Sequence, residues 1–318
     1  MSILKEDYPN VLWDGKQELP IVVTFGAGVD STAKLVNMWK LNIRPSVIIF
    51  ADTGGERPDI YAHIEKVNKW CKKVDFPTVT VVKHSHKNHG QEGLLGELKR
   101  RKSLPSIAFG FKTCSLKYKT TACQRHIVQK LGIKEYIKTI GYGTGEIDRA
   151  IKSCESIKNG KVKFYKGENM KLWFPLIDWK LNRSDCKKLS STVGFCTAKS
   201  SCFFCPAMKS SEVVLLSKHY PEQFKESVEL EREFLKAEKE RFNDEVCNAI
   251  DLFGLNWVHM KRDKDGCFEG TQVKFPKETK IKGLGRSWNW SKYIESYSPD
   301  LPFMEEFGVD MGCGCTDF

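Results

Sequence analysis

The sequence contains no hydrophobic run long enough to cross a membrane, and its apolar stretches, such as residues 47–51, are only as long as a β-strand. It also contains no internal repeat and no low-complexity segment. Lys5, Glu6 and Asp7 stand where an export signal would be apolar, so we expect no such signal. These absences argue against membrane, repeat and secreted proteins, and they predict a globular cytoplasmic protein without a membrane partner.

Acidic residues are outnumbered, because 51 Lys and Arg stand against 40 Asp and Glu and give a net charge of +11. Such a charge suits a polyanionic partner, either a nucleic acid or a multiply charged nucleotide. Lys99, Arg100, Arg101 and Lys102 form a basic cluster, which is the candidate contact for nucleic acid. The alternative is that the excess charge only solubilises the surface and that this cluster is a solvated helix end.

The chain has twelve cysteines, yet it lacks the small size and the export signal of a disulfide-rich secreted domain. We therefore expect a reducing compartment, with metal-binding, redox or catalytic thiols among the cysteines. Lone cysteines within helical patterns, such as Cys71 and Cys247, are expected to be small buried hydrophobes.

Strands alternate with helices through the first half of the chain. The strand patterns lie at residues 21–23, 46–51, 78–83 and 136–141. This alternation predicts an α/β fold with a Rossmann-like parallel sheet flanked by helices. We expect residues 1–150 to form a nucleotide-binding domain. Residues 151–318 should form a cysteine-containing helical region packed on it, with one long amphipathic helix over residues 221–253.

The turn after the first strand is the strongest functional signal. Gly26, Ala27 and Gly28 form a tight turn, and Asp30 and Ser31 open the following helix. Such a strand–turn–helix presents unpaired backbone N–H groups and the positive end of the helix dipole, which together bind anions such as phosphate. The turn lacks the lysine of the Walker loop and the glycine spacing of the dinucleotide fingerprint. An ordinary turn without a ligand is the alternative.

This turn resembles the Ser-Gly-Gly-x-Asp-Ser loop of the adenine nucleotide alpha-hydrolase superfamily, also called PP-loop ATP pyrophosphatases. Gly26 replaces the family's serine and Ala27 replaces its first glycine. Phe25, Gly26 and Ala27 are also similar to the loop of the sulfonucleotide reductases in the same superfamily. The resemblance implies the HUP-type Rossmann-like fold and an adenine nucleotide, either ATP with Mg²⁺ or phosphoadenosine phosphosulfate (PAPS).

Four later segments resemble PAPS reductases in the same order. Residues 49–61 are similar to their Asp-Thr-Gly segment, and residues 113–117 are similar to their Cys-Cys-x-x-x-Lys, with Thr113 in place of one cysteine. Residues 141–149 resemble their Gly…Glu…Arg element, and residues 174–179 resemble their Tyr-Pro-Leu-x-x-Trp. The order and spacing over roughly residues 20–210 are more specific than any single motif. The similarity extends to phage and bacterial members that carry a Cys-x-Phe-Cys-Pro knuckle.

The resemblance implies a set of site residues. Asp30, Ser31, Lys117 and Arg149 are the candidate catalytic residues, with Asp30 on Mg²⁺ and the two cations neutralising phosphate or sulfate. The candidate nucleotide-binding residues are Phe25, Gly26, Ala27, Gly28, Asp30, Ser31, Asp52, Thr53, Gly54, Gly141 and Glu146. The alternatives are that Asp52 only caps its turn and that Lys117 and Arg149 form surface ion pairs.

The cysteines of the knuckle suggest a metal site. Cys202 and Cys205 form a Cys-x-x-Cys pair, which suits Zn²⁺ or an iron–sulfur cluster. Iron–sulfur adenylyl-sulfate reductases bind a 4Fe–4S cluster with an early cysteine pair and a later Cys-x-x-Cys. The resemblance therefore implies ligation by Cys114, Cys202 and Cys205, with Cys196 as the candidate fourth ligand. Cys313 and Cys315 are alternative ligands, and a redox dithiol or a plain buried pair is the alternative to a metal.

Three functions are compatible with these motifs. The first is ATP-dependent adenylation coupled to sulfur transfer on a nucleic acid or nucleotide. The second is the reduction of phosphoadenylyl sulfate or adenylyl sulfate by a thiol. The third is a non-enzymatic module that binds nucleotide or nucleic acid, since a fold does not fix a function. The sequence leaves a homodimer open.

Overall fold

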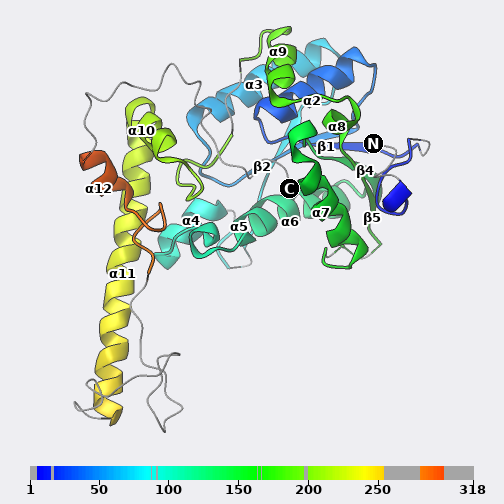
Figure 1. Ribbon diagram of the computed structural model, residues 1–318. Coiled ribbons are helices and arrows are strands. Elements are labelled where there is room, and N and C mark those ends of the chain that lie inside the picture. The colour runs from blue at the N-terminus through cyan, green and yellow to red at the C-terminus, as the bar shows by residue number, and fades with distance from the viewer. Residues whose placement is uncertain are drawn as a thin grey trace.

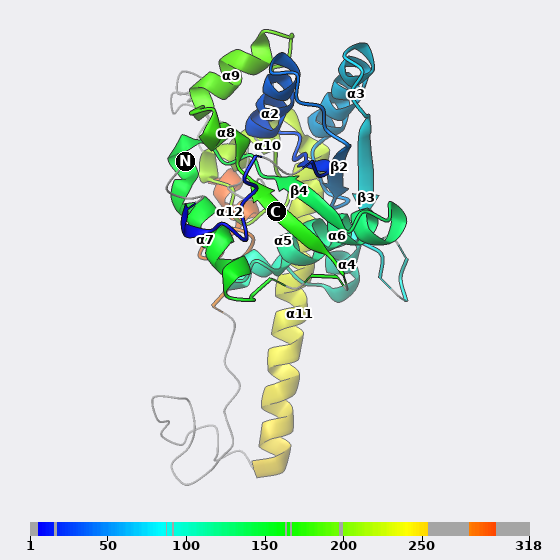
Figure 2. The same cartoon turned by 90° about the vertical axis from the view of Figure 1, so that its right-hand side faces the viewer.

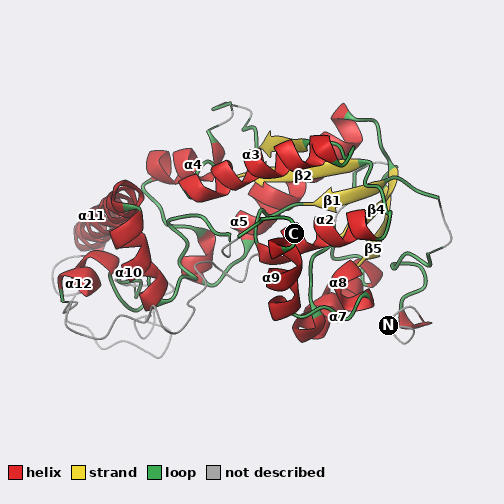
Figure 3. Ribbon diagram, turned by 90° about the horizontal axis from the view of Figure 1, so that it is seen from above, coloured by secondary structure: helices red, strands yellow, loops and turns green. Residues whose placement is uncertain are grey.

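The chain folds around a five-stranded parallel sheet. The computed structural model describes residues 6–15, 18–86, 88–90, 92–162, 164–165, 167–196, 200–253 and 280–296. Its strands run in the order β3-β2-β1-β4-β5 (Figure 3). Their bounds are β1 Ile21–Thr24, β2 Val47–Asp52, β3 Val79–Lys83, β4 Glu135–Thr139 and β5 Asn169–Trp173. The predicted α/β fold with a Rossmann-like parallel sheet is confirmed, and four of its strands lie where the pattern placed them.

The fifth strand was not predicted. The sequence pattern marked residues 172–179 only as an apolar block, whereas Asn169–Trp173 pairs in parallel with Glu135–Thr139. The start of β5 is polar and its burial is uneven, so the apolar signal begins only near its end. The α/β layer therefore continues beyond residue 150, inside the region predicted to be mainly helical.

Strand β1 is the centre of the sheet, since it pairs with β2 on one side and β4 on the other. Val22 and Val23 are both fully buried, and they belong to core clusters on opposite faces. A strand covered on both faces needs continuous apolar residues, which is what the run at 21–23 supplies. The strand order reverses between β1 and β4, and the carboxyl ends of strands at such a switch point are where open α/β sheets bind ligands.

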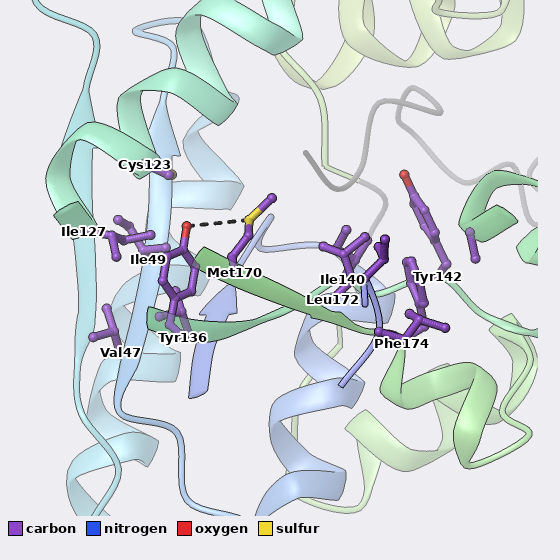
Figure 4. Close-up of a cluster of buried hydrophobic side chains, with 14 of the residues drawn as sticks. Val47, Ile49, Cys123, Ile127, Tyr136, Ile140, Tyr142, Met170, Leu172 and Phe174 are labelled. Atoms are coloured by element: carbon purple, nitrogen blue, oxygen red, sulfur yellow. Dashed lines mark hydrogen bonds between the residues drawn. The ribbon is translucent and has the colours of Figure 1, made fainter. Parts of the chain in front are cut away.

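Helices cover both faces of the sheet. Helices α2 (Val29–Lys40) and α3 (Pro58–Lys73) pack on one face, while α6 (Thr121–Arg125) and α7 (Ile147–Lys158) cover the other (Figures 1 and 2). Figure 4 shows the core of the second face, where Tyr136 and Ile127 lie toward one end and Tyr142 and Phe174 toward the other. Cys123 and Cys154 are buried in this core, as Cys71 is in the first.

The connections are mostly short helices. They are α4 (Gly93–Arg101), the 3-10 helix η1 (Ser106–Phe109), α5 (Thr113–Ser115), the π-helical turns η2 (Leu116–Thr120) and η3 (His126–Lys130), the 3-10 helix η4 (Thr144–Glu146), α8 (Pro175–Asp178) and α9 (Arg183–Ser191). Asn182 caps α9 by accepting hydrogen bonds from the backbone N–H groups of Ser184 at 2.8 Å and Asp185 at 3.1 Å. The Asp185 carboxylate accepts the Asn182 N–H in return at 3.1 Å, which completes a capping box.

The last described elements form a helical group beside the sheet. They are α10 (Ser210–His219), α11 (Pro221–Phe253) and α12 (Trp290–Glu295), and the long helix α11 extends away from the body (Figures 1 and 2). Helix α11 has the predicted bounds. Its Glu231 is fully buried and accepts hydrogen bonds from the backbone N–H groups of Leu284 at 2.7 Å and Trp290 at 3.1 Å. The carboxylate thereby ties α12 and the segment before it to α11.

None of the described helices combines the length and the apolar character that crossing a membrane requires. Two predictions about cysteines concern residues whose side chains the structure does not describe. Cys247 lies outside the residues whose side chains are described, and Cys313 and Cys315 lie outside the described chain.

One core group predicts a pH dependence of folding. His63 on α3 is buried, and its Nε2 lies 2.9 Å from the Thr32 hydroxyl on α2. Burial, aided by the positive charge of Lys66, lowers the pKa of His63 from 6.5 to about 4. The unfolded chain protonates this group at a higher pH than the folded chain does. The stability it contributes is therefore fully present above pH 6.5 and is lost as the pH falls toward 4, by about 3 kcal/mol in total.

The measurement is the free energy of unfolding by urea across this pH window. His63→Gln can keep the contact with Thr32 without titrating, so its free energy of unfolding should fall less steeply than that of the parent chain. His89→Gln, at an exposed histidine, is the control and should keep the parent slope. Equal slopes for His63→Gln and the parent would contradict the assignment.

Candidate functional site

The turn after β1 leads directly into the N-terminus of α2. Gly28 is the N-cap of α2, and its N–H donates to the Ser31 Oγ at 3.1 Å while the Ser31 hydroxyl lies 3.2 Å from the Gly28 carbonyl. Ala27 has a φ of 58°, in the left-handed region that costs a non-glycine residue about 1 kcal/mol. Glycine would adopt this φ without strain. Phe25, a predicted nucleotide contact, is fully buried in the core beside His63.

Asp30 is held by an arginine that the sequence did not reveal. Its Oδ2 accepts a hydrogen bond from the Arg183 Nη1 at 2.6 Å, which joins α2 to α9. Burial, together with the charge of Asp30, raises the pKa of the nearby Cys186 thiol to about 12. Asp30 is the acidic residue of the first turn of α2, and its charge is already balanced by Arg183. This donor set does not fit a magnesium ion held by the protein itself.

A second cation lies beneath the turn. Lys34 is fully buried, and its Nζ donates to the carbonyl oxygens of Thr24 at 2.9 Å and Thr139 at 3.3 Å. These carbonyls end β1 and β4, so the ammonium group satisfies both strand ends at the switch point. Buried ammonium groups are rare because desolvation is costly. Lys34 therefore brings a fixed positive charge to the place where the fold binds ligands.

The end of β2 forms a second wall of the site. Asp52 Oδ1 accepts hydrogen bonds from the Gly54 N–H at 2.7 Å and the Tyr61 hydroxyl at 2.8 Å, and Lys83 Nζ lies 3.1 Å from its Oδ2. Asp52 thus caps the turn that contains Gly54. Turn capping was the alternative to the predicted nucleotide contact of Asp52. Thr53 is buried, and its carbonyl accepts the Leu94 N–H at the start of α4 at 2.7 Å.

The cysteine knuckle docks onto this wall. Residues 56 and 202 form an isolated antiparallel bridge, and the Phe203 N–H donates to the Gly55 carbonyl at 2.9 Å. Cys202 Sγ lies 3.1 Å from the Thr53 hydroxyl. A Cβ on Gly55 would lie 2.0 Å from the Phe204 ring, so only glycine allows this approach. The knuckle therefore meets the end of β2 in the folded chain, although about 150 residues separate them in sequence.

The knuckle also reaches the turn after β1. A Cβ on Gly28 would lie 3.0 Å from the Ser200 Oγ. Ser200 and Ser201 are both buried. The turn at 25–28, the end of β2 and residues 200–205 therefore converge at the carboxyl edge of the sheet.

Glu56 is the acidic group of this junction, and no motif singled it out. It is 4% exposed, and its Oε1 lies 3.1 Å from the Thr53 hydroxyl, 3.6 Å from Cys202 Sγ and 3.8 Å from Lys119 Nζ. Its Oε2 is buried without a hydrogen-bond partner among the described residues. Leaving such an atom unsatisfied costs about 1–3 kcal/mol, which is the kind of cost that functional sites carry.

The two predicted phosphate-neutralising cations have carboxylate partners. Lys117 Nζ lies 2.6 Å from Glu97 Oε2, and Tyr118 also hydrogen-bonds this carboxylate. Burial alone would raise the pKa of Glu97, but the hydrogen bonds from Lys117 and Tyr118 outweigh it and lower that pKa to about 2. Arg149 pairs with Glu146 and lies over the Tyr142 ring at 4.4 Å.

The remaining predicted residues follow β4. Gly141 is buried directly after the strand, and Gly143 sits where a Cβ would lie 3.1 Å from the Leu181 carbonyl. The Thr24 hydroxyl donates to the Thr139 carbonyl at 2.6 Å, so the ends of β1 and β4 are directly joined. This side of the switch point is therefore closely packed against the turn after β1.

Only three of the four candidate metal ligands lie in the same part of the structure. Cys114, Cys202 and Cys205 belong to one apolar cluster, whereas Cys196 is exposed. Among the described residues, no three His, Cys, Asp or Glu side chains are arranged so that they could hold a metal ion. The described side chains do not fit a four-cysteine iron–sulfur or zinc site. The metal assignment stays a prediction that rests on the resemblance.

The predicted nucleic-acid cluster is neutralised by acidic partners. Lys99 pairs with Glu226, Arg100 with Glu92 at 2.8 Å, Arg101 with Glu97 at 3.1 Å and Lys102 with Glu233 at 3.8 Å. Two of these carboxylates lie on α11, so the cluster fastens α4 to the long helix. The positive charge that suggested a nucleic-acid contact is therefore largely balanced by carboxylates of the protein itself.

Comparison with known proteins does not place the chain in a family. No known protein family and no curated protein sequence matches the chain. Among solved structures, the chain is similar to the U34-tRNA thiolase NcsA from Methanococcus maripaludis with its [4Fe-4S] cluster. The match has 14% identity and a TM-score of 0.38, and it covers 92% of this chain and 87% of that one. These values assign neither a family nor an activity to the chain.

The docking of the knuckle can be tested at Gly55. Gly55→Ala places a methyl group inside the Phe204 ring, so we expect a loss of about 2 kcal/mol or more in the free energy of unfolding. The same variant should speed the reaction of Cys202 with a thiol reagent, because the knuckle would separate from β2.

The matched control is Gly145→Ala, where no atom lies within 4 Å of the added Cβ, and its cost should stay within about 0.5 kcal/mol. Phe204→Leu should reduce the cost of Gly55→Ala, because the two positions share one space. Additive costs in the double variant would mean that the contact between Gly55 and Phe204 is not the cause.

Proposed function

We propose that the chain is a PP-loop enzyme that binds an adenine nucleotide at the turn after β1 and acts at its α-phosphate. The observation that carries the proposal is the convergence of three segments at the switch point of the sheet. They are the turn at 25–28 with Ser31, the buried end of β2, and the knuckle at 200–205. The resemblance to PP-loop proteins supports the same conclusion.

The phosphates of the nucleotide would bind at the N-terminus of α2. The backbone N–H groups of the first turn of α2 are the donors there, together with the Ser31 hydroxyl once it turns from the Gly28 carbonyl toward a phosphate oxygen. Lys34 adds a fixed positive charge beneath them. Arg183 would bind a phosphate oxygen, with Asp30 orienting its guanidinium group. Asp30 then acts through Arg183, and Mg²⁺ would enter with the nucleotide rather than reside in the protein.

The chemistry proposed for this site is adenylation followed by sulfur transfer. An acceptor oxygen attacks the α-phosphorus of ATP, the bond to the β-phosphate breaks, and pyrophosphate leaves. A sulfide-level sulfur donor then attacks the activated carbon of the acceptor, and AMP leaves with the oxygen. Lys34 and Arg183 would stabilise the negative charge that develops on the phosphates. No step is assigned to an iron–sulfur cluster.

A second candidate is a sulfonucleotide reductase, and the position of Cys202 beside Thr53 favours it. In that reaction a thiolate attacks the sulfur of PAPS or adenylyl sulfate. A sulfur–sulfur bond forms, the sulfur–oxygen bond breaks, and the nucleotide phosphate leaves. A second thiol would then release sulfite and leave a disulfide.

The test is nucleotide binding by calorimetry, followed by product analysis. Ser31→Ala and Arg183→Gln should each weaken ATP binding by about 10-fold or more, because each removes a phosphate contact. Lys188→Gln removes the same charge from an exposed site on the same helix and should leave the affinity unchanged. Unchanged ATP affinity in both site variants, with unchanged melting temperatures, would overturn the proposal.

Product analysis separates the two chemistries. Pyrophosphate and AMP formed from ATP would support adenylation, and sulfite released from PAPS with a dithiol present would support reduction. Nucleotide binding without either product would favour the non-enzymatic module.

A further inference from the structure

A cavity of about 620 Å³ lies on the α6–α7 side of the sheet. Its floor is made by Ile140, Met170 and Leu172, whose side chains Figure 4 shows along β4 and β5. Its walls come from η2 and α6 on one side and from α7 on the other. The volume is that of a small-molecule site, large enough for one nucleotide.

The lining of this cavity is strongly basic. Five cations line it: Lys112, Lys138, Arg149, Lys152 and Lys161. The described lining contains no Asp or Glu. Three of them, Lys112, Lys152 and Lys161, are exposed, and no ion pair joins them to a carboxylate within the described ranges. The cations at residues 99–102, by contrast, are each paired with a carboxylate. A concave surface with cations of this kind attracts an anionic ligand.

The cavity also offers groups for a base and a sugar. Tyr142 is buried, and its ring is covered by Phe174, with the ring centroids 5.7 Å apart, and by Arg149 at 4.4 Å, so a base would lie on the apolar floor instead. Ser153 and Ser156 line the wall beside the apolar floor. An apolar floor, hydroxyl groups and cations in one cavity match the base, the sugar and the phosphate of a nucleotide.

Two exposed apolar side chains lie in the lining or next to a lining residue in the chain. Leu116 lines the cavity and is 60% exposed, and Phe111, next to Lys112 in the chain, is 65% exposed. Large exposed aromatic side chains beside cations are typical of surfaces on which unpaired bases stack. A free nucleotide would need no such extension, so the surface favours a longer ligand.

We propose that this cavity binds one unstacked nucleotide of a single-stranded nucleic acid. Lys152 and Lys161 contact its phosphates, and a neighbouring base stacks on Phe111. The cavity adjoins the site of the proposed function, because Ile140, which lines the cavity, directly follows β4, the strand paired with β1. The binding of the nucleic acid does not itself require ATP. Only the role of the nucleic acid as the acceptor of sulfur rests on the proposed function.

The experiment measures the binding of a fluorescein-labelled RNA or DNA strand of about 12 nucleotides by anisotropy. Lys152→Glu/Lys161→Glu should weaken binding at least 10-fold. It should also reduce the slope of log K against log salt by about 1.4, because two phosphate contacts are lost. Phe111→Ala should weaken binding by about 5-fold or more through the lost stacking.

The matched control is Lys72→Glu/Lys73→Glu, which makes the same charge change at exposed positions of α3, on the other face of the sheet. It should keep the parent affinity. Equal weakening by the two double variants would mean that only the net charge matters, and this would overturn the proposal. A duplex that binds as tightly as the single strand would overturn it as well.

Competition with AMP separates a strand from a free nucleotide. The strand should bind at least 10-fold more tightly than AMP, and equal affinities would overturn the assignment of a strand. Titration of the same proteins with ATP keeps the two proposals distinct. Loss of strand binding in Lys152→Glu/Lys161→Glu supports the cavity whether or not Ser31→Ala weakens ATP binding.

Discussion

The arrangement of the site depends on the contact between Phe204 and the backbone of Gly55. A side chain at residue 55 would occupy the volume of the ring, because its Cβ would lie 2.0 Å from the nearest ring atom. This contact, together with the bridge between residues 56 and 202, holds the knuckle against the end of β2. Without it, Ser200 would not reach Gly28, and Cys202 would not reach Thr53. The site would then consist only of the turn after β1 and the end of β2, without the knuckle.

Charge is the second constraint on this edge. The titratable side chains of Asp30, Lys34, Asp52 and Glu56 are all buried at this edge. Lys34 is satisfied by the strand ends, and Asp30 is paired with Arg183, whereas one oxygen of Glu56 has no partner in the described part of the chain. Buried charge of this kind destabilises a fold unless it is compensated, and it is typical of sites that bind charged ligands.

The fold was largely predictable because its signals are local. The strand patterns and the bounds of α11 each follow from neighbouring residues. Strand β5 escaped because its first residues are polar. In the turn after β1, Gly28 and Ser31 hydrogen-bond each other at the start of α2, and Ala27 has a left-handed φ that a glycine would adopt without strain.

The partners of the site residues were not predictable, because they come from distant parts of the chain. Arg183 pairs with Asp30 across 153 residues, and Lys99 pairs with Glu226 across 127. Sequence reasoning assigned the basic cluster to nucleic acid because the acidic residues of α11 lie far from it in the chain. The cations around the α6–α7 cavity are scattered through the sequence, so no run of charge revealed them.

The central claim is that one nucleotide site is built jointly by the turn after β1, the end of β2 and the knuckle. Hydrogen–deuterium exchange with and without a non-hydrolysable ATP analogue tests this claim directly. We expect the analogue to slow exchange at residues 25–31, 52–56 and 200–205 together and to leave residues 147–158 unchanged. Slower exchange confined to residues 147–158, or no change at 200–205, would contradict it.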